Sequence, residues 1–218
     1  MLTINFIISI INSNAFLRIV KREDLLNMKM NMDEKYKVIF NGNEYYFDLM
    51  KISEKSAIAV FDALSDIKMA NDACVDMIKT LESKQFTKDN FDTIVTAESK
   101  SVTMAAYIAN HYGKDLVILR KKKRNFFKEI VEATVETFTT RGNSTLYLDV
   151  THSSKYLRNK RVLIFDDVLS TGSSLKAMIE IMNKMDARVV GKAFIFNEGD
   201  DERESDVYYV HKLPIIEV

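Results

Sequence analysis

The stretch that decides the fold is Val162-Leu-Ile-Phe-Asp-Asp-Val-Leu-Ser-Thr-Gly-Ser-Ser174. Four large apolar residues lead directly into two carboxylates, Asp166 and Asp167, and a hydroxyl-rich turn follows at Ser170–Ser174. Downstream, apolar residues recur at helical spacing, at Leu175, Met178, Ile179, Met182 and Met185. The stretch therefore predicts a buried strand, an acidic pair, a short loop and a helix, in that order.

The predicted loop suits a ligand that combines a phosphate with a sugar. An unbroken apolar strand is typical of a parallel sheet covered on both faces, and ligands bind beyond the carboxyl ends of such strands. We therefore expect Asp166 and Asp167 to emerge at that edge. Ser170–Ser174 would offer backbone N–H groups, hydroxyls and a helix N-terminus to the phosphate. The carboxylates would accept hydrogen bonds from ribose hydroxyls.

This order of residues closely resembles the signature of the type I phosphoribosyltransferases, which bind 5-phosphoribosyl 1-diphosphate (PRPP). The departure is Ser173, where many members carry a second glycine, and serine fits there if its backbone angle stays ordinary. The motifs G-x-x-x-x-G-K-[ST] and G-x-G-x-x-G do not occur in the sequence. We prefer the signature to the plain alternative, a strand, turn and helix with surface acids, because the combination is far more specific than a lone glycine-rich loop.

The composition indicates a globular protein with one sizeable core. The chain has 218 residues, of which 47% are apolar and 28% charged. Lys plus Arg and Asp plus Glu balance at 31 each, so no overall field favours nucleic acid or an anionic membrane as a partner. The single cysteine, Cys74, excludes an intrachain disulfide and lies on an apolar helix face that predicts burial. This cysteine count fits a cytoplasmic protein.

The N-terminal residues lack a recognisable pattern. We expect 1–34 to be an extension ahead of one domain that spans 35–218. Met1–Ile11 is apolar, but it is shorter than the roughly 20 residues that a membrane span needs, and no signal-peptide cleavage site follows it. We therefore expect no membrane partner. The sequence has one proline and six glycines, so no flexible linker marks a further domain boundary.

Strand and helix patterns alternate along the rest of the chain. Tyr36–Phe40 and Glu44–Phe47 predict a β-hairpin around Asn41-Gly42, and Asp66 can cap the helix that carries Cys74. A second helix follows from Val102 to Tyr112. Further strands are predicted at Ala57–Phe61, Thr93–Ala97, Leu116–Leu119, Glu132–Phe138, Ser144–Leu148, Val189–Phe196 and Val207–Val210.

This alternation argues for an α/β fold with a mainly parallel sheet flanked by helices. The N-terminal hairpin would form a small hood over the strand ends. The order of elements resembles the adenine phosphoribosyltransferase-like branch of the family over roughly Lys35–Val218. The resemblance therefore implies the type I phosphoribosyltransferase fold, and it implies a homodimer.

Two further segments resemble the parts of the family that bind diphosphate. Ala97-Glu98-Ser99-Lys100-Ser101 follows a strand and opens a helix, so Ser99 and Lys100 would meet phosphate oxygens. Ser101 stands where the family usually has a glycine. The alternative to a phosphate ligand is that Lys100 is an ordinary solvated lysine at the start of a helix. Ile-Leu-Arg-Lys at 118–121 resembles the second segment, which implies Arg120 and Lys121 as ligands.

The basic run Arg120–Arg124 does not by itself indicate diphosphate binding. Taken alone, such a run is typical of a nucleic-acid patch or a solvated turn. Its position after a predicted strand, beside the predicted site, favours the diphosphate role. Lys122, Lys123 and Arg124 would then be loop charges, and 125–144 would form a flap that covers the site.

The resemblance implies a phosphoribosyltransferase of nucleotide salvage, which converts a nitrogenous base and PRPP to a nucleoside monophosphate and pyrophosphate. Asp166 and Asp167 would be catalytic by holding the ribose hydroxyls, and they would hold Mg²⁺ directly or through water. The residues implied in PRPP binding are Ser170, Thr171, Gly172, Ser173, Ser174, Ser99, Lys100, Arg120 and Lys121.

The base is less constrained by the sequence. Hypoxanthine–guanine enzymes of this fold carry an aspartate three residues after the second acid, and Ser170 stands at that place here. This favours a purine, adenine above xanthine, with a pyrimidine as a further option. The alternatives to a transferase are a PRPP-sensing regulator, as in the bacterial purine repressors, and a degenerate paralogue that only binds PRPP. Such repressors add a winged-helix module, for which residues 1–35 are too short.

Overall fold

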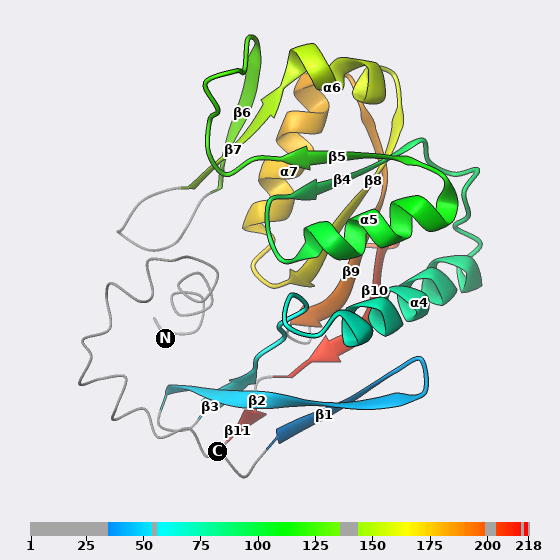
Figure 1. The fold of residues 1–218 in the computed structure, drawn as a ribbon, viewed down its shortest axis with the longest axis vertical. Coiled ribbons are helices and arrows are strands. Elements are labelled where there is room, and N and C mark those ends of the chain that lie inside the picture. The colour runs from blue at the N-terminus through cyan, green and yellow to red at the C-terminus, as the bar shows by residue number, and fades with distance from the viewer. Residues whose placement is uncertain (1–34, 54–55, 136–143, 199–203, 215, 218) are drawn as a thin grey trace.

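The computed structural model describes residues 35–53, 56–135, 144–198, 204–214 and 216–217. Its centre is a parallel sheet of five strands in the order β10-β9-β8-β4-β5 (Figure 1). This sheet confirms the predicted α/β fold. Its strands are β4 (Thr93–Ala97), β5 (Asp115–Leu119), β8 (Arg161–Leu169), β9 (Arg188–Glu198) and β10 (Val207–Leu213).

Helices cover both faces of the sheet, which explains why the central strand has an unbroken apolar run. Leu163 and Phe165 of β8 join the core beneath α4 and α5, whereas Val162 and Ile164 join the core beneath α7. Successive side chains of a strand point to opposite faces, so both sets must be apolar. The helices are α4 (Ile67–Ser83), α5 (Ser101–Tyr112) and α7 (Ser173–Lys184).

The hood is an antiparallel sheet of four strands in the order β1-β2-β3-β11, and the ends of β9 and β10 point toward it (Figure 1). The predicted hairpin is confirmed. Strand β3 ends two residues before the predicted Phe61, and β11 was not predicted because a two-residue strand has no readable pattern. The hood strands are β1 (Lys35–Phe40), β2 (Asn43–Ser53), β3 (Ser56–Ala59) and β11 (Ile216–Glu217).

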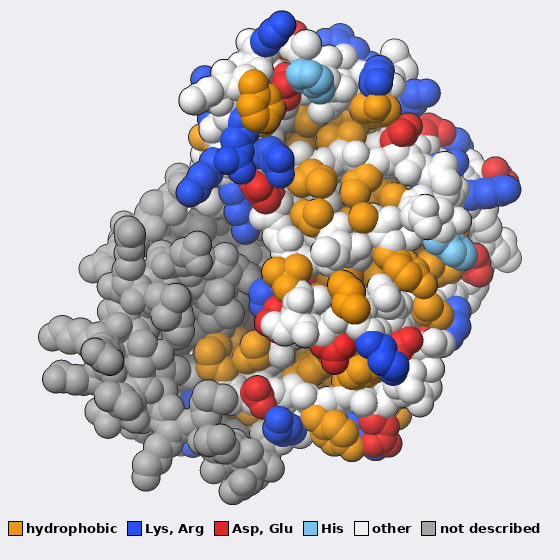
Figure 2. All heavy atoms as spheres, in the orientation of Figure 1, with side chains coloured by type: hydrophobic (Ala, Val, Ile, Leu, Met, Phe, Trp, Pro, Cys, Tyr) orange, Lys and Arg blue, Asp and Glu red, His pale blue; other side chains and the backbone are white. Residues whose placement is uncertain are grey.

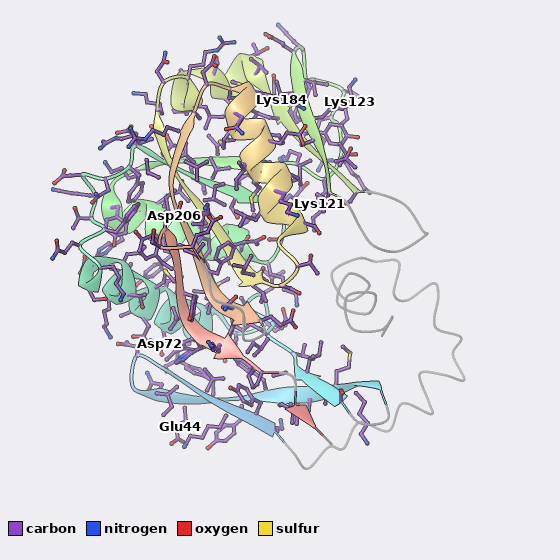
Figure 3. The ribbon with its side chains drawn as sticks, turned by 180° about the vertical axis from the view of Figure 1, so that it is seen from behind. Glu44, Asp72, Lys121, Lys123, Lys184 and Asp206 are labelled. Carbon is purple, nitrogen blue, oxygen red and sulfur yellow. The ribbon has the colours of Figure 1, made fainter. Side chains whose placement is uncertain are left out.

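Two carboxylates of α4, Asp72 and Asp76, fasten the hood hairpin to that helix, and Asp76 accepts a hydrogen bond from the Asn41 backbone N–H at 2.6 Å. Asp72 accepts hydrogen bonds from the Asn41 and Asn43 amides at 3.1 and 2.8 Å, and from the Tyr45 hydroxyl at 2.5 Å. Figure 3 shows Asp72 on α4 between the helix and the hairpin that carries Glu44. These contacts fix the hood relative to the sheet, and those of Asp72 pull its pKa below the usual value, chiefly through Tyr45.

A second hairpin, β6 (Ile130–Val135) and β7 (Ser144–Asp149), packs beside α7. Glu132 to Val135 were correctly predicted as strand, but the rest of the predicted strand to Phe138 and the turn at 141–143 lie outside the described residues. Helix α6 (Val150–Leu157) was missed. Only its two end residues are buried and its middle is polar, so its sequence shows no apolar stripe.

Two smaller predictions about α4 are confirmed. Asp66 accepts a hydrogen bond from the Met69 amide at 2.9 Å and caps the helix. Cys74 is fully buried, and burial raises the pKa of its thiol to about 12, so it packs as a small apolar residue. Among the described helices, none is long and apolar enough to cross a membrane.

Candidate functional site

The acidic pair lies within β8, whereas the sequence predicted it beyond the strand end. Strand β8 continues to Leu169 because β9 runs beside it, with Asp166 opposite Phe194. Strand β4 pairs with β8 only as far as Ile164. The last residues of β8, which include the acidic pair, therefore extend past the end of β4. The loop that follows β4 lies beside these carboxylates.

Asp166 is the more buried carboxylate of the pair, with an exposed fraction of 8%. One of its oxygens accepts a hydrogen bond from the Ser99 hydroxyl at 3.2 Å and another from the Asp167 backbone N–H at 3.0 Å. Burial raises the pKa of Asp166, and the neighbouring Asp167 raises it further. A cation or a ring of hydroxyl donors beside the pair would favour the ionised form.

The predicted phosphate loop ends in an open helix N-terminus. Gly172 has φ 75° and ψ 5°, a left-handed conformation that glycine adopts without strain, and no side chain caps α7. The Thr171 and Ser173 hydroxyls lie 3.0 Å apart at the same turn. Ser173 is not among the described non-glycine residues with positive φ, so the serine fits as expected. The backbone N–H groups of this turn can bind an anion.

The loop after β4 is braced by a chain of hydroxyls. Ser101 is fully buried, and its hydroxyl lies 2.7 Å from that of Thr96 and 2.6 Å from that of Ser99. Ser101 also opens α5 without a positive φ, so a serine fits at this position without backbone strain. The chain of hydroxyls runs from Thr96 through Ser101 and Ser99 to Asp166. Sequence reasoning missed Thr96, which looked like an ordinary strand residue.

Lys100 is directed to the hood. Its ammonium group donates to the Phe61 carbonyl oxygen at 3.1 Å and lies 3.7 Å from the Asp62 carboxylate. The side chain is 29% exposed. The structure therefore brings Ser99 to the acidic pair and places the neighbouring Lys100 against the segment that links the hood to α4.

Glu98 organises the basic turn that follows β5. Its two carboxylate oxygens accept hydrogen bonds from the Arg120 guanidinium at 3.1 Å and the Lys121 backbone N–H at 3.0 Å, and Arg124 lies 3.5 Å away. The turn presents a dense group of cationic side chains on the face drawn in Figure 2, and Figure 3 labels Lys121 and Lys123 within it. Sequence reasoning missed this role of Glu98, because Glu98 precedes Arg120 by 22 residues and no local pattern pairs the two.

A further acid of the site, the buried Glu198, was not predicted. It ends β9 with an exposed fraction of 9%, and its carboxylate accepts a hydrogen bond from the Ser170 hydroxyl. Burial raises the pKa of Glu198, and the Ser170 hydrogen bond opposes that rise. A weak signal was present, because Glu198 stands one residue beyond the apolar run 193–196, whereas Asp166 directly follows 162–165.

Comparisons with known proteins agree with this geometry. A model of the phosphoribosyl transferase domain matches residues 62–217. An adenine phosphoribosyltransferase of Brachyspira hyodysenteriae is 31% identical over 60% of this chain and 75% of its own. A xanthine phosphoribosyltransferase of Stutzerimonas stutzeri is 30% identical over 60% and 70%. A hypoxanthine/guanine phosphoribosyltransferase of Methanococcus voltae is 29% identical over 88% and 94%.

The fold has a counterpart among solved structures. An adenine phosphoribosyltransferase of Thermoanaerobacter pseudethanolicus superposes with a TM-score of 0.57 at 21% identity, over 86% of this chain and 99% of its own. The match of the family model covers the link from the hood, the whole parallel sheet and the signature loop. The chain therefore belongs to the type I phosphoribosyltransferase family of enzymes and has the fold of its adenine phosphoribosyltransferase-like branch.

Proposed function

We propose that this protein transfers the phosphoribosyl group of PRPP to a ring nitrogen of a purine base, with release of pyrophosphate. The observation that supports this most is the hydrogen bond between Ser99 and Asp166. It joins the loop expected to bind diphosphate to the acids expected to bind ribose. The two halves of a PRPP site thus meet at one edge of the sheet.

The site can bind each part of PRPP with a different group. The 5′-phosphate would lie on the backbone N–H groups of Ser170–Ser174 and on the hydroxyls of Thr171, Ser173 and Ser174, at the N-terminus of α7. The ribose hydroxyls would donate to Asp166 and Asp167. The diphosphate would lie between the loop Ser99–Ser101 and the cations Arg120 and Lys121, whose turn Glu98 holds in place.

The chemistry is a displacement at C1 of ribose. The bond from C1 to the diphosphate oxygen breaks, its electron pair leaves with the diphosphate, and the base nitrogen forms the new bond to C1. Positive charge develops on the ribose ring, and the negative charges of Asp166 and Asp167 stabilise it. The protein thus contributes mainly orientation and electrostatic stabilisation.

The donor set at the acidic pair fits Mg²⁺ bound together with PRPP. Asp166 and Asp167 supply hard oxygen ligands whose mutual repulsion a cation would relieve. In the described residues no group of three or more His, Cys, Asp or Glu lies together, so the remaining ligands would be diphosphate oxygens and water. Bound Mg²⁺ would neutralise charge on the leaving diphosphate.

Among purines we favour adenine. The relatives are named for adenine, xanthine and hypoxanthine/guanine, so their names leave the base open. Ser170 stands where the hypoxanthine–guanine enzymes carry an aspartate, which favours a base without the 6-oxo group. The homodimer, the cytoplasmic location and the absence of a nucleic-acid partner stay predictions, and no observation supports the PRPP-sensing regulator.

The test is a steady-state assay of pyrophosphate release with PRPP, Mg²⁺ and six bases: adenine, hypoxanthine, guanine, xanthine, uracil and orotate. We expect the highest kcat/KM for adenine. A lead of about tenfold for hypoxanthine or guanine, some 1.4 kcal/mol, would contradict the adenine assignment but keep the transferase. Release with none of the bases would contradict the transferase.

A further inference from the structure

The carboxylate of Glu198 lies where the signature loop meets the neighbouring strand. Leu169 of β8 is paired with Asn197 of β9, so Ser170 and Glu198 are the next residues along the two strands. The Ser170 hydroxyl donates to the Glu198 carboxylate. Glu198 is therefore held against the loop that we assign to PRPP, although the mechanism above makes no use of it.

The strand geometry places Glu198 on the face that the hood covers. Side chains two residues apart in a strand share a face. Two residues before Ser170 and Glu198, Val168 and Phe196 are paired, and both pack in the core that includes the hood aromatics. The rings of Phe196 and Phe61 are 5.0 Å apart at an angle of 70°. Glu198 thus lies between the phosphate loop and the hood, at the end of the site left for a base.

We propose that Glu198 recognises the base by accepting a hydrogen bond from the exocyclic amino group of a 6-aminopurine. The inference rests on the proposed function and narrows its substrate class. An ionised carboxylate only accepts hydrogen bonds, so a 6-oxo oxygen in the same place would leave two acceptors facing each other. Carboxylate oxygens accept several hydrogen bonds at once, so the bond from Ser170 is compatible with one from the base. Burial strengthens each such bond.

The test compares adenine with hypoxanthine in the wild type and in Glu198→Gln, which keeps the side-chain size but adds N–H donors that can face a 6-oxo group. We expect the ratio of kcat/KM for adenine to that for hypoxanthine to fall at least about tenfold, while the KM for PRPP stays within about twofold. Glu180→Gln is the matched control, because Glu180 is exposed on α7 and pairs with Lys184 at 2.6 Å. Its ratio should equal that of the wild type.

A second variant guards against a folding defect in Glu198→Gln. Ser170→Ala removes the hydroxyl that holds Glu198, and it should shift the ratio in the same direction by a smaller factor. An unchanged ratio in both variants, with an active wild type, would overturn the role of Glu198 and leave the transferase intact. If either variant lost more kcat/KM with hypoxanthine than with adenine, that result would overturn the role of Glu198 as well. A wild type that uses no base would overturn the proposed function, and this inference with it.

Discussion

The Glu98 carboxylate accepts a hydrogen bond from the Arg120 guanidinium at 3.1 Å, and through this contact the loop after β4 fixes the turn after β5. The same carboxylate holds the Lys121 backbone N–H at 3.0 Å. The side chains of Glu98 and Arg120 are 31% and 37% exposed, so the ion pair itself adds little to folding stability. Its consequence is orientation, because the Arg120 guanidinium and the backbone of Lys121 are held in place before PRPP binds.

Replacing Glu98 with Gln should weaken PRPP binding. The amide can still accept from Arg120, but it no longer attracts the cations, so we expect the Kd for PRPP to rise by a factor of about 3 to 10, or 0.7 to 1.4 kcal/mol. Isothermal titration with PRPP and Mg²⁺ measures this change. Glu132→Gln on the exposed side of β6 is the control. Tighter PRPP binding by Glu98→Gln would show that Glu98 competes with the diphosphate.

Removing either charge of the acidic pair should slow the reaction. Asp166→Asn and Asp167→Asn should each lower kcat/KM for PRPP by at least about tenfold, roughly 1.4 kcal/mol of transition-state stabilisation. The reason is that the two carboxylates lie beside the phosphate loop, where positive charge would develop on ribose. Steady-state kinetics at saturating base measure the effect, with circular dichroism as the check on folding. Wild-type turnover by both folded variants would remove the central claim of the mechanism.

Substitutions in the phosphate loop should affect PRPP binding and folding stability to different extents. Thr171 is exposed, so Thr171→Leu should abolish measurable PRPP binding and leave the melting temperature nearly unchanged. Gly172→Leu should also abolish binding, but it should cost about 1–2 kcal/mol of stability, because a side chain at φ 75° is strained even where nothing lies within 4 Å of the added Cβ. Titration calorimetry and thermal melts measure the two properties. Unaltered PRPP affinity in Thr171→Leu would place the phosphate elsewhere.

The predictable part of this molecule follows local patterns. The run 162–174 identified the strand, the acids and the loop, because an apolar strand, a carboxylate pair and a glycine turn each depend on neighbouring residues. The residue at which β8 ends could not be predicted from neighbouring residues. It depends on where β9 stops pairing, and that moved Asp166 from beyond the strand to within it.

Contacts between distant segments account for the rest of the site. Glu98 and Arg120 are far apart in sequence, as are Ser170 and Glu198, and no pattern within one segment pairs them. Helix α6 was missed for a different reason, since its polar middle has no apolar period. The sequence therefore predicted residue types at the site better than their partners.

The ion pair between Asp92 and Arg161 should make folding stability depend on pH. Arg161 donates to the Asp92 carboxylate through Nη2 at 2.7 Å, Nε at 3.2 Å and its backbone N–H at 2.9 Å. These hydrogen bonds lower the pKa of Asp92 from 3.8 to about 2. A lowered carboxyl pKa adds stability that is complete above the unfolded value and is lost as the pH falls through the folded value.

Asp92→Asn should therefore destabilise the protein at neutral pH and progressively less in acid. We expect a loss of about 1 kcal/mol at pH 7, kept small because both side chains are partly exposed, which lowers the melting temperature by about 2 to 4 °C. The difference from the wild type should narrow as the pH falls from 5 toward 2. Asp89→Asn is the control, since Asp89 contacts Arg161 through its backbone carbonyl. A difference in melting temperature that is constant from pH 7 to pH 3 would show that the loss does not arise from the Asp92 charge.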